Sequence, residues 1–431
     1  MNQLELTQSF REGEITVKDY LSQIENYFSE REPAVLAFIP EEQRFERLYK
    51  EAGALVEKFP EPMNRPPLFG RLVGVKDIFH ADGFVTQAGS RLPADELQGS
   101  EAESVTRLKN AGALILGKTI TTEFAYFSPG PTRNPHNPEH TPGGSSSGSA
   151  AAVAVGLCSL ALGTQTIGSI IRPAAFCGVV GFKPTYERIS REGVIPLSPS
   201  LDHVGFFTPD VETAQKVARV LIGDWRPEAG DQRLETGDSK PVLGIPDGPY
   251  LQCASAEGLA HFEEMCKLLS TDYQIRRVRV MDDLQEIRNR HDAIMSYDTA
   301  QVHQQWYAKH SILYSSKFSD LIRRGQSVSN LQSLISARDA FHTSITQTMN
   351  ENQIDLWICP PTIGPAPKGL ESTGDPVMCL PWTQLGLPAV NLPAGKNEEG
   401  LPMGLQVVGN WYMDEALLYW CSHLEQIVSK R

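Results

Sequence analysis

The stretch "TPGGSSSGSAAAVAVG", Thr141 to Gly156, joins a glycine- and serine-rich segment to an alanine-rich one. It lies within an alternation of strand-like and helix-like segments, and this alternation indicates the fold. The expected strands are "LFGRLVGVKDIF" (68–79), "ALILGKT" (113–119) and "LCSLALGTQT" (157–166), and the expected helices are "ESVTRLKNAG" (103–112) and "SAAAVAVG" (149–156). Strands separated by helices of this length predict an α/β fold with a mixed, largely parallel central sheet that helices cover on both faces. The glycine- and serine-rich segment therefore lies inside a domain and is not a spacer between domains.

The surrounding sequence predicts a single domain over residues 1–431, without an internal repeat. The expected parts are an N-terminal helical region (1–67), the core motifs (68–223), a helical insertion or cap (255–350) and a C-terminal return to the core sheet (351–431). A polar, turn-rich stretch from Asp224 to Lys240 is expected to form an exposed loop.

Composition favours a protein that acts on small molecules. Of the 431 residues 41% are hydrophobic and 21% are charged, and the formal net charge is -13. Binding to nucleic acid depends on clustered Lys and Arg residues that neutralise phosphates, and the chain has no long run of them, so no nucleic-acid partner is expected. No secretory signal is visible, and the longest apolar run, Ala150 to Gly163, is too short to span a bilayer. No membrane association is therefore expected.

The cysteines are scattered along the chain without a C-x-x-C motif. They are Cys158, Cys177, Cys253, Cys266, Cys359, Cys379 and Cys421. An odd number with this spacing suggests neither a disulfide framework nor a zinc site. We expect buried free thiols in a reducing compartment, and therefore a cytoplasmic protein.

Three patterns match known motifs, but their context argues against each of them. "GALILGKT", 112–119, fits the phosphate-loop pattern, although its apolar residues predict a buried strand whose N–H groups belong to a ladder. Residues 144–148 fit the G-x-S-x-G nucleophile elbow, but the proline-rich segment before them does not predict a strand. His136 and His140 have the spacing of metal ligands on a helix, which the nearby prolines exclude. Neither a metal nor a cofactor is expected.

A lysine and two serines carry the chemistry that the sequence suggests. Lys76 in "GVKD" follows an apolar strand, and burial there would lower its pKa so that the neutral amine could act as a base. Ser145 in "GGSSSGS" and Ser169 in "GTQTIGSIIRP" lie in glycine-containing loops, close to main-chain N–H donors. Together they supply a base, a relay hydroxyl, an attacking hydroxyl and an oxyanion hole without a histidine.

From about Leu68 onward the chain resembles the amidase signature family. The matching stretches are the lysine strand, "HTPGGSSSGSAAAVAVG", "LALGTQTIGS", "AAFCGVVGFKPT", "SLDHVG", "GLPAVNLPAG" and "GLPMGLQVVG". The resemblance implies that Ser169 is the nucleophile, that Ser145, preceded by a cis peptide bond, is the bridging serine, and that Lys76 is the base. It also implies an oxyanion hole formed by the main-chain N–H groups of Ile167, Gly168 and Ser169, together with Thr166.

The chain departs from the family pattern around the nucleophile. Where much of the family has "GTDTGGSIR", this chain has "GTQTIGSIIR", so that Gln165 replaces the acid and Ile167 replaces a small residue. Arg172 follows the nucleophile by three residues, as in malonamidase-like members, where the arginine grips the substrate carboxylate. Arg172 is thus expected either to bind a carboxylate, with Thr164 lining the same pocket, or to pair with a structural carboxylate.

The resemblance implies an amidase that hydrolyses a small amide to a carboxylate and ammonia or an amine through an acyl-enzyme, with a malonamate-type substrate as the sharper expectation. Alternatives are an ester or carbamate hydrolase with the same triad, a protein similar to the A subunit of an amidotransferase, which needs partner chains, and a catalytically silent binding protein. Family members also suggest a homodimer.

Overall fold

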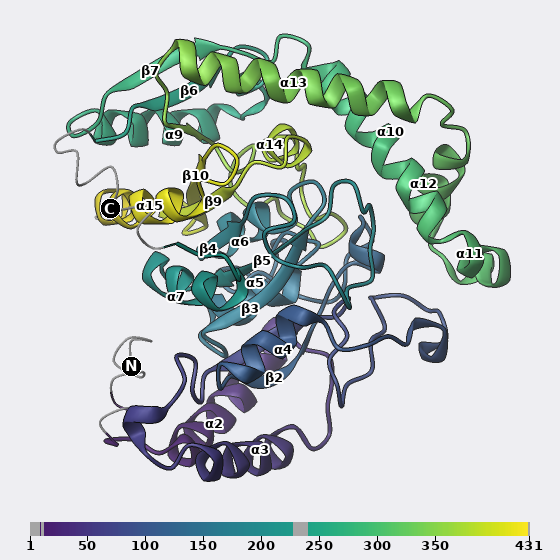
Figure 1. The fold of residues 1–431 in the computed structure, drawn as a ribbon, viewed down its shortest axis with the longest axis vertical. Coiled ribbons are helices and arrows are strands. Elements are labelled where there is room, and N and C mark those ends of the chain that lie inside the picture. The colour runs from purple at the N-terminus through teal and green to yellow at the C-terminus, as the bar shows by residue number, and fades with distance from the viewer. Residues whose placement is uncertain (1–8, 10–12, 227–239, 430–431) are drawn as a thin grey trace.

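The computed structural model describes residue 9 and residues 13–226 and 240–429. Within these residues ten strands form one sheet (Figure 1). They are β1 (Leu72–Lys76), β2 (Leu114–Thr119), β3 (Leu160–Gln165), β4 (Val180–Lys183), β5 (His203–Thr208), β6 (Leu243–Asp247), β7 (Ile275–Arg279), β8 (Leu356–Cys359), β9 (Ala389–Lys396) and β10 (Pro402–Val408). Residues 227–239 of the loop expected at Asp224–Lys240 lie outside the described residues.

The strands run across the sheet in the order β2-β1-β3-β5-β4-β9-β10-β8-β6-β7. β1 pairs in parallel with β2 and β3 at one flank, and β6 pairs in parallel with β7 and β8 at the other. The pairs between these flanks are all antiparallel. The α/β fold with a mixed sheet is confirmed, but the expectation of a largely parallel sheet holds only for the flanks. The centre differs partly because β9 and β10 are consecutive strands with a short connection, which suits antiparallel pairing.

Helices cover both faces of the sheet. The longer ones are α2 (Val17–Val35), α3 (Arg44–Lys58), α4 (Glu103–Asn110), α5 (Ser147–Ala154), α6 (Ile171–Cys177), α7 (Val211–Leu221), α9 (Ala256–Leu269), α10 (Leu284–Val302), α11 (Gln304–His310), α12 (Ser316–Gln326), α13 (Leu331–Glu351), α14 (Leu380–Gln384) and α15 (Asp414–Val428). Short 3-10 helices are η1 (Pro62–Asn64), η2 (Ala94–Leu97), η3 (Glu123–Ala125), η4 (Leu251–Cys253) and η5 (Ser311–Leu313).

Alternation along the strands divides the core into two clusters, because successive side chains of a strand point to opposite faces. Val73 of β1 and Ile115 of β2 belong to the cluster that includes apolar residues of α4, α7 and α15. Leu72 and Leu114 belong to the other cluster, with apolar residues of α2, α3 and α5. Lys76, four residues after Leu72, therefore lies on the face of β1 that α5 covers.

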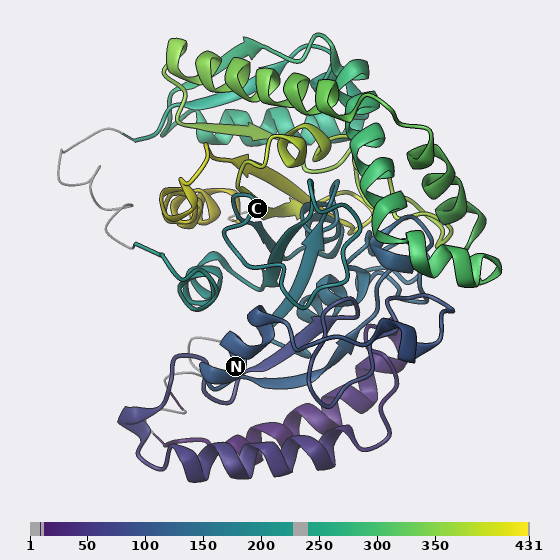
Figure 2. The ribbon, with the colours of Figure 1, turned by 45° about the vertical axis from the view of Figure 1, so that its right-hand side comes forward.

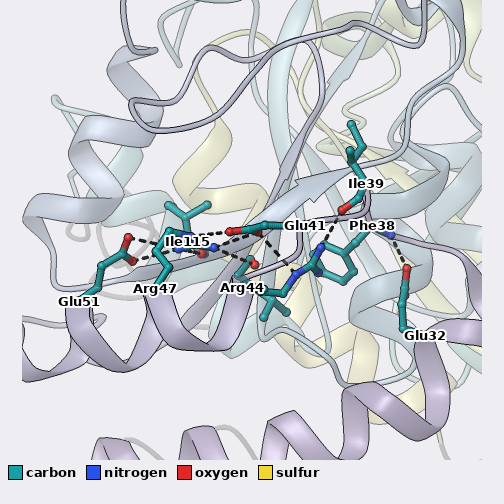
Figure 3. A network of polar contacts seen from close by, with 9 residues as sticks. Glu32, Phe38, Ile39, Glu41, Arg44, Arg47, Glu51 and Ile115 are labelled. Carbon is teal, nitrogen blue, oxygen red and sulfur yellow. Dashed lines mark hydrogen bonds and ion pairs between the residues drawn. The ribbon is translucent and has the colours of Figure 1, made fainter.

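The N-terminal helices close one edge of the sheet at β2 (Figure 3). Arg47 on α3 donates from Nη1 to the carbonyl of Ile115 at 2.9 Å and from Nη2 to that of Leu116 at 3.3 Å. Glu41 and Glu51 hold the same guanidinium, with N–O distances of 2.7 Å and 3.1 Å. An uncovered edge strand offers free carbonyls to other chains, so the arginine makes this edge unavailable for pairing.

The segment expected to be a helical insertion or cap contains a strand that the sequence analysis missed. β7, "IRRVR", forms the far edge of the sheet, and its charged residues are partly or fully exposed. A charged edge strand lacks the apolar pattern by which strands are recognised, which explains the omission. The rest of the segment is helical, and α10 to α13 (green) run over one end of the molecule and down one side (Figures 1 and 2).

None of the described helices has both the length and the apolar character needed to cross a membrane. All seven cysteines are free thiols, and all but Cys253 are buried.

Candidate active site

Lys76 ends β1 in the interior of the protein. Its side chain is fully buried, and its Nζ donates to the Oγ of Ser145 and the Oγ1 of Thr164, both at 2.8 Å. The neighbouring carboxylate of Asp77 pairs with Lys118 instead, at 2.8 Å. Burial without an ion-pair partner within the described residues lowers the pKa of Lys76 well below its usual 10.5, and the charge of Asp202 opposes this shift only in part. The neutral amine, which can accept a proton, is therefore favoured.

Ser145 lies in a tight turn that explains the glycines before it. Gly143 has φ +79°, and a Cβ there would lie 2.8 Å from the Cα of Pro173. A Cβ on Gly144 would lie 2.8 Å from the Cγ2 of Thr373, so Gly143 requires glycine and a side chain at Gly144 would have to displace Thr373. The Gly144–Ser145 peptide bond is cis, as the family resemblance implied. The glycine-rich segment is thus a fixed turn inside the fold.

The other serines of this segment are bound to main-chain atoms. The Oγ of Ser146 lies 3.4 Å from the N and 3.3 Å from the O of Thr164, and Ser149 donates to the carbonyl of Leu162 at 2.8 Å. Ser146 is the position that a nucleophile elbow would use, but it is buried and no strand precedes it. The structure therefore agrees with the sequence-based rejection of the elbow. The phosphate-loop pattern is rejected equally, since 114–119 forms β2.

Ser169 lies in the loop that connects β3 to α6. Among the described residues, none accepts a hydrogen bond from the main-chain N–H groups of Ile167, Gly168 or Ser169. The next two N–H groups, of Ile170 and Ile171, both donate to the Oε1 of Gln165, at 2.8 Å and 2.9 Å. The loop thus presents three consecutive donors that are free to bind an anion. Gln165, which replaces the family's acid, caps the start of α6.

A small cavity brings the predicted residues together. Ser145, Ser169, Thr166, Ile167 and Arg172 all line it, and its volume of about 10 Å³ is close to the space that one water molecule requires. Ala125, Tyr126, Phe127, Leu197 and Pro376 complete the wall. A larger cavity of about 530 Å³ elsewhere in the described structure contains none of the predicted catalytic residues. The chemistry therefore points to the small cavity, in which only small groups fit without movement of the wall.

Arg172 is buried beside this cavity. Its Nη2 donates to the carbonyl of Gly144 at 2.7 Å and to the Oγ1 of Thr373 at 3.0 Å. Its Nε and Nη1 are buried and have no partner among the described residues. Burial lowers its pKa to about 10, which leaves it charged at neutral pH. No described carboxylate forms an ion pair with Arg172, so the expected structural pairing is not found, and part of the guanidinium holds the turn at Gly144.

Thr164, near the end of β3, lies beside Lys76. Its hydroxyl accepts a hydrogen bond from Lys76, and the residue is not among those that line the cavity with Arg172. Thr164 thus supports the lysine.

Three residues that the sequence analysis did not place in the site hold the loop around Ser169. Asp202 accepts from the Oγ1 of Thr166 at 2.5 Å, and burial raises its pKa to about 6. Thr383 donates to the carbonyl of Ile167 at 2.6 Å and accepts from the Nε2 of Gln165 at 2.9 Å. His291 on α10 donates from Nε2 to the carbonyl of Thr166 at 3.0 Å. "SLDHVG" was a signal for Asp202, whereas no motif marks Thr383 or His291.

The two histidines with metal-ligand spacing each contact a main-chain carbonyl group of another segment. The Nε2 of His136 lies 2.9 Å from the carbonyl of Cys177, and the Nδ1 of His140 lies 2.7 Å from that of Ala366. Both rings are thus engaged separately with main-chain atoms. No group of three or more His, Cys, Asp or Glu side chains among the described residues is arranged to hold a metal ion.

Comparison with known proteins places the site in context. The model of the family described as Amidase matches residues 16–418. A curated relative, the A subunit of the glutamyl-tRNA(Gln) amidotransferase of Symbiobacterium thermophilum, is 32% identical over 460 residues, which cover 96% of this chain and 94% of the relative.

Solved structures agree with the sequence comparison. A crystal structure of an amidase superposes with a TM-score of 0.87 at 30% identity, covering 99% of this chain and 100% of the other. A chain from a vestigial protein complex, described in connection with the origin of an s-triazine catabolic enzyme, gives a TM-score of 0.88 at 25% identity, with 99% and 98% coverage.

Proposed function

The chain belongs to the amidase signature family, and from this premise we propose that it is a serine amidohydrolase that cleaves the C–N bond of a small amide through an acyl-enzyme. In this proposal Ser169 is the nucleophile, Ser145 the relay and Lys76 the base. One observation carries it: the buried amine of Lys76 lies 2.8 Å from the Oγ of Ser145, which shares a cavity with Ser169.

The first half of the reaction forms the acyl-enzyme. As the Oγ of Ser169 attacks the carbonyl carbon, its proton passes to Ser145, whose own proton passes to the neutral amine of Lys76. The new C–O bond places a negative charge on the former carbonyl oxygen. The free N–H groups of Ile167, Gly168 and Ser169 stabilise this charge.

The second half of the reaction releases the products. The C–N bond breaks as Ser145 returns a proton to the nitrogen, which is necessary because an amide anion is too basic to leave unaided. Lys76 restores the proton of Ser145. Water then attacks the acyl-enzyme by the same relay in reverse, releasing a carboxylate and regenerating Ser169.

We further propose that the acyl part of the substrate is small and carries a carboxylate. Ile167 lines the cavity where much of the family has a smaller residue, which supports a small acyl group. The unpartnered Nε and Nη1 of Arg172 support binding of an anion, because a buried guanidinium donor without an acceptor is costly.

The test of this proposal is ammonia release from malonamate, its C4 and C5 monoamide homologues and propionamide. We expect the carboxylated amides to be preferred, and Arg172→Lys to lower kcat/KM for them by about 10- to 100-fold, the range for loss of a charge-assisted pair. Lysine keeps one donor for the carbonyl of Gly144 but lacks the planar fork. Propionamide is the matched control, and an equal loss for every substrate would assign Arg172 to structure alone.

A second candidate is a component of an amidotransferase complex, which the similarity to glutamyl-tRNA(Gln) amidotransferase chains favours. Such a protein would need partner chains for its activity. Turnover of small amides by the purified chain would support the first proposal over this one, and paired ester and carbamate substrates would show which bond is preferred. We also propose that the enzyme is a cytoplasmic homodimer, and light scattering of the purified protein tests the dimer.

A further inference from the structure

Three carbonyl groups of the loop from Thr166 to Ser169 accept hydrogen bonds from residues outside these four positions. The carbonyl of Thr166 accepts from His291, that of Ile167 from Thr383, and that of Gly168 from the main-chain N–H of Arg172, at 3.0, 2.6 and 3.0 Å. In a planar trans peptide the C=O and the following N–H point in opposite directions. Each of these three donors therefore also sets the direction of one free N–H, and His291 sets that of Ile167.

The hydrogen bond between His291 and the carbonyl of Thr166 determines which ring nitrogen of His291 carries the proton. A carbonyl oxygen only accepts, so the Nε2 of His291 must carry the proton. The ring is buried, which lowers its pKa to about 3, and it therefore stays neutral over the ordinary pH range. Its Nδ1 is left as a buried acceptor without a partner among the described residues. A buried acceptor of this kind reduces stability, so packing alone does not account for a histidine here.

We propose that His291 is a positioning residue for the oxyanion hole. Its imidazole N–H holds the carbonyl of Thr166 and thereby aims the N–H of Ile167 at the oxygen that becomes negative during attack by Ser169. This inference rests on the proposed function of Ser169. His291 lies on α10, outside the core motifs at 68–223, so the helical region does more than cover the sheet: it orients one donor of the catalytic loop.

The test replaces His291 with two amide side chains of different length. The Nε2 of glutamine in His291→Gln can replace the histidine Nε2, whereas the shorter amide in His291→Asn cannot extend to Thr166. The readout is the second-order rate of labelling of Ser169 by a fluorophosphonate, whose P=O oxygen occupies the oxyanion hole. In that reaction the Oγ–P bond forms, the P–F bond breaks, fluoride leaves, and the serine proton passes through Ser145 to Lys76.

We expect His291→Asn to lower the labelling rate by about 10- to 100-fold, somewhat less than the effect of deleting an oxyanion donor outright. His291→Gln should keep the rate within about 3-fold of wild type. Met349→Ala, a buried change on α13 that does not line the cavity, serves as the control for lost stability. It should lower the melting temperature without lowering the labelling rate. If His291→Asn does not fold, His291→Leu removes the donor in the same way.

Equal labelling rates in the asparagine, glutamine and wild-type proteins would overturn the proposed role of His291, as would equal losses in both variants. Hydrolysis of small amides is measured in parallel, so that failure of the proposed role of His291 can be distinguished from failure of the proposed amidase function. A wild-type protein that is labelled at Ser169 but hydrolyses no amide contradicts the amidase proposal and leaves the comparison at His291 valid. A wild-type protein that is not labelled at Ser169 overturns both.

Discussion

Lys76→Met is expected to lower kcat for amide hydrolysis by about 10³- to 10⁴-fold, the upper part of the range for loss of a general base. Methionine has a similar length and no group that can accept a proton, so the relay through Ser145 ends. The measurement is kcat of the purified variant at saturating amide.

Lys183→Met is the matched control for this loss. Lys183 is also fully buried, and burial lowers its pKa to about 7, but its Nζ contacts the carbonyls of Pro184 and Leu387 and it does not line the cavity. This variant should lose stability and keep kcat within about 3-fold of wild type if it folds. An undiminished kcat in Lys76→Met would contradict the proposed base.

The same Lys76→Met substitution is expected to raise the melting temperature at neutral pH. Unfolded Lys76 binds a proton up to its ordinary pKa of 10.5, whereas burial makes the folded protein release that proton at a lower pH. Between these two pKa values the unfolded state binds more protons, so stability rises with pH, and below the folded pKa the lysine is destabilising to its full extent. The increase in melting temperature that methionine produces should therefore shrink as pH approaches 10.5. Melting curves of both proteins, recorded from neutral pH to pH 10.5, check this trend. An increase that grows with pH would show that burial does not lower the pKa of Lys76.

Ser169→Ala is expected to produce the largest loss, about 10⁴- to 10⁶-fold in kcat, as for removal of a nucleophile that acts as a unit with its base. Substrate affinity should change little, because the oxyanion donors are main-chain groups that alanine retains. Ammonia release at high enzyme concentration gives the residual rate, and calorimetric titration with the amide gives the affinity.

Ser146→Ala tests the alternative nucleophile, Ser146, which is the central serine of the G-x-S-x-G pattern. The hydroxyl of Ser146 faces the main chain of Thr164, and the residue does not line the cavity. Its replacement should leave kcat within about 10-fold of wild type, since at most a buried hydrogen bond is lost. The opposite pattern, loss in Ser146→Ala and activity in Ser169→Ala, would restore the nucleophile-elbow hypothesis.

The sequence allowed prediction of those features that depend on local pattern. The alternation of apolar strands and small-residue helices predicted the segments around β1 to β3, and the family motifs named Lys76, Ser145 and Ser169, which the fold brings into one region. The charged edge strand β7 escaped prediction because its pattern is that of an exposed segment.

Features that depend on distant contacts could not be predicted. His291 and Thr383 touch the loop before Ser169 across 125 and 216 positions of the chain, and neither lies in a recognisable motif. The bond from Arg172 to the carbonyl of Gly144 was also not foreseeable, since it depends on how the turn at Ser145 approaches α6. The contact between Lys76 and Thr164 was not foreseeable for the same reason, because it joins two strands 88 positions apart in the chain.

The pH dependence of Ser169 labelling shows whether a buried neutral lysine activates this serine through Ser145. Fluorophosphonate labelling, with peptide mapping of the adduct, would be followed from about pH 5 to about pH 10 in wild type and Lys76→Met. We expect an adduct on Ser169 and a wild-type rate that rises through a single pKa well below 10.5, a rise that Lys76→Met lacks. Identical profiles in the two proteins, or an adduct on another serine, would rule out this role of Lys76.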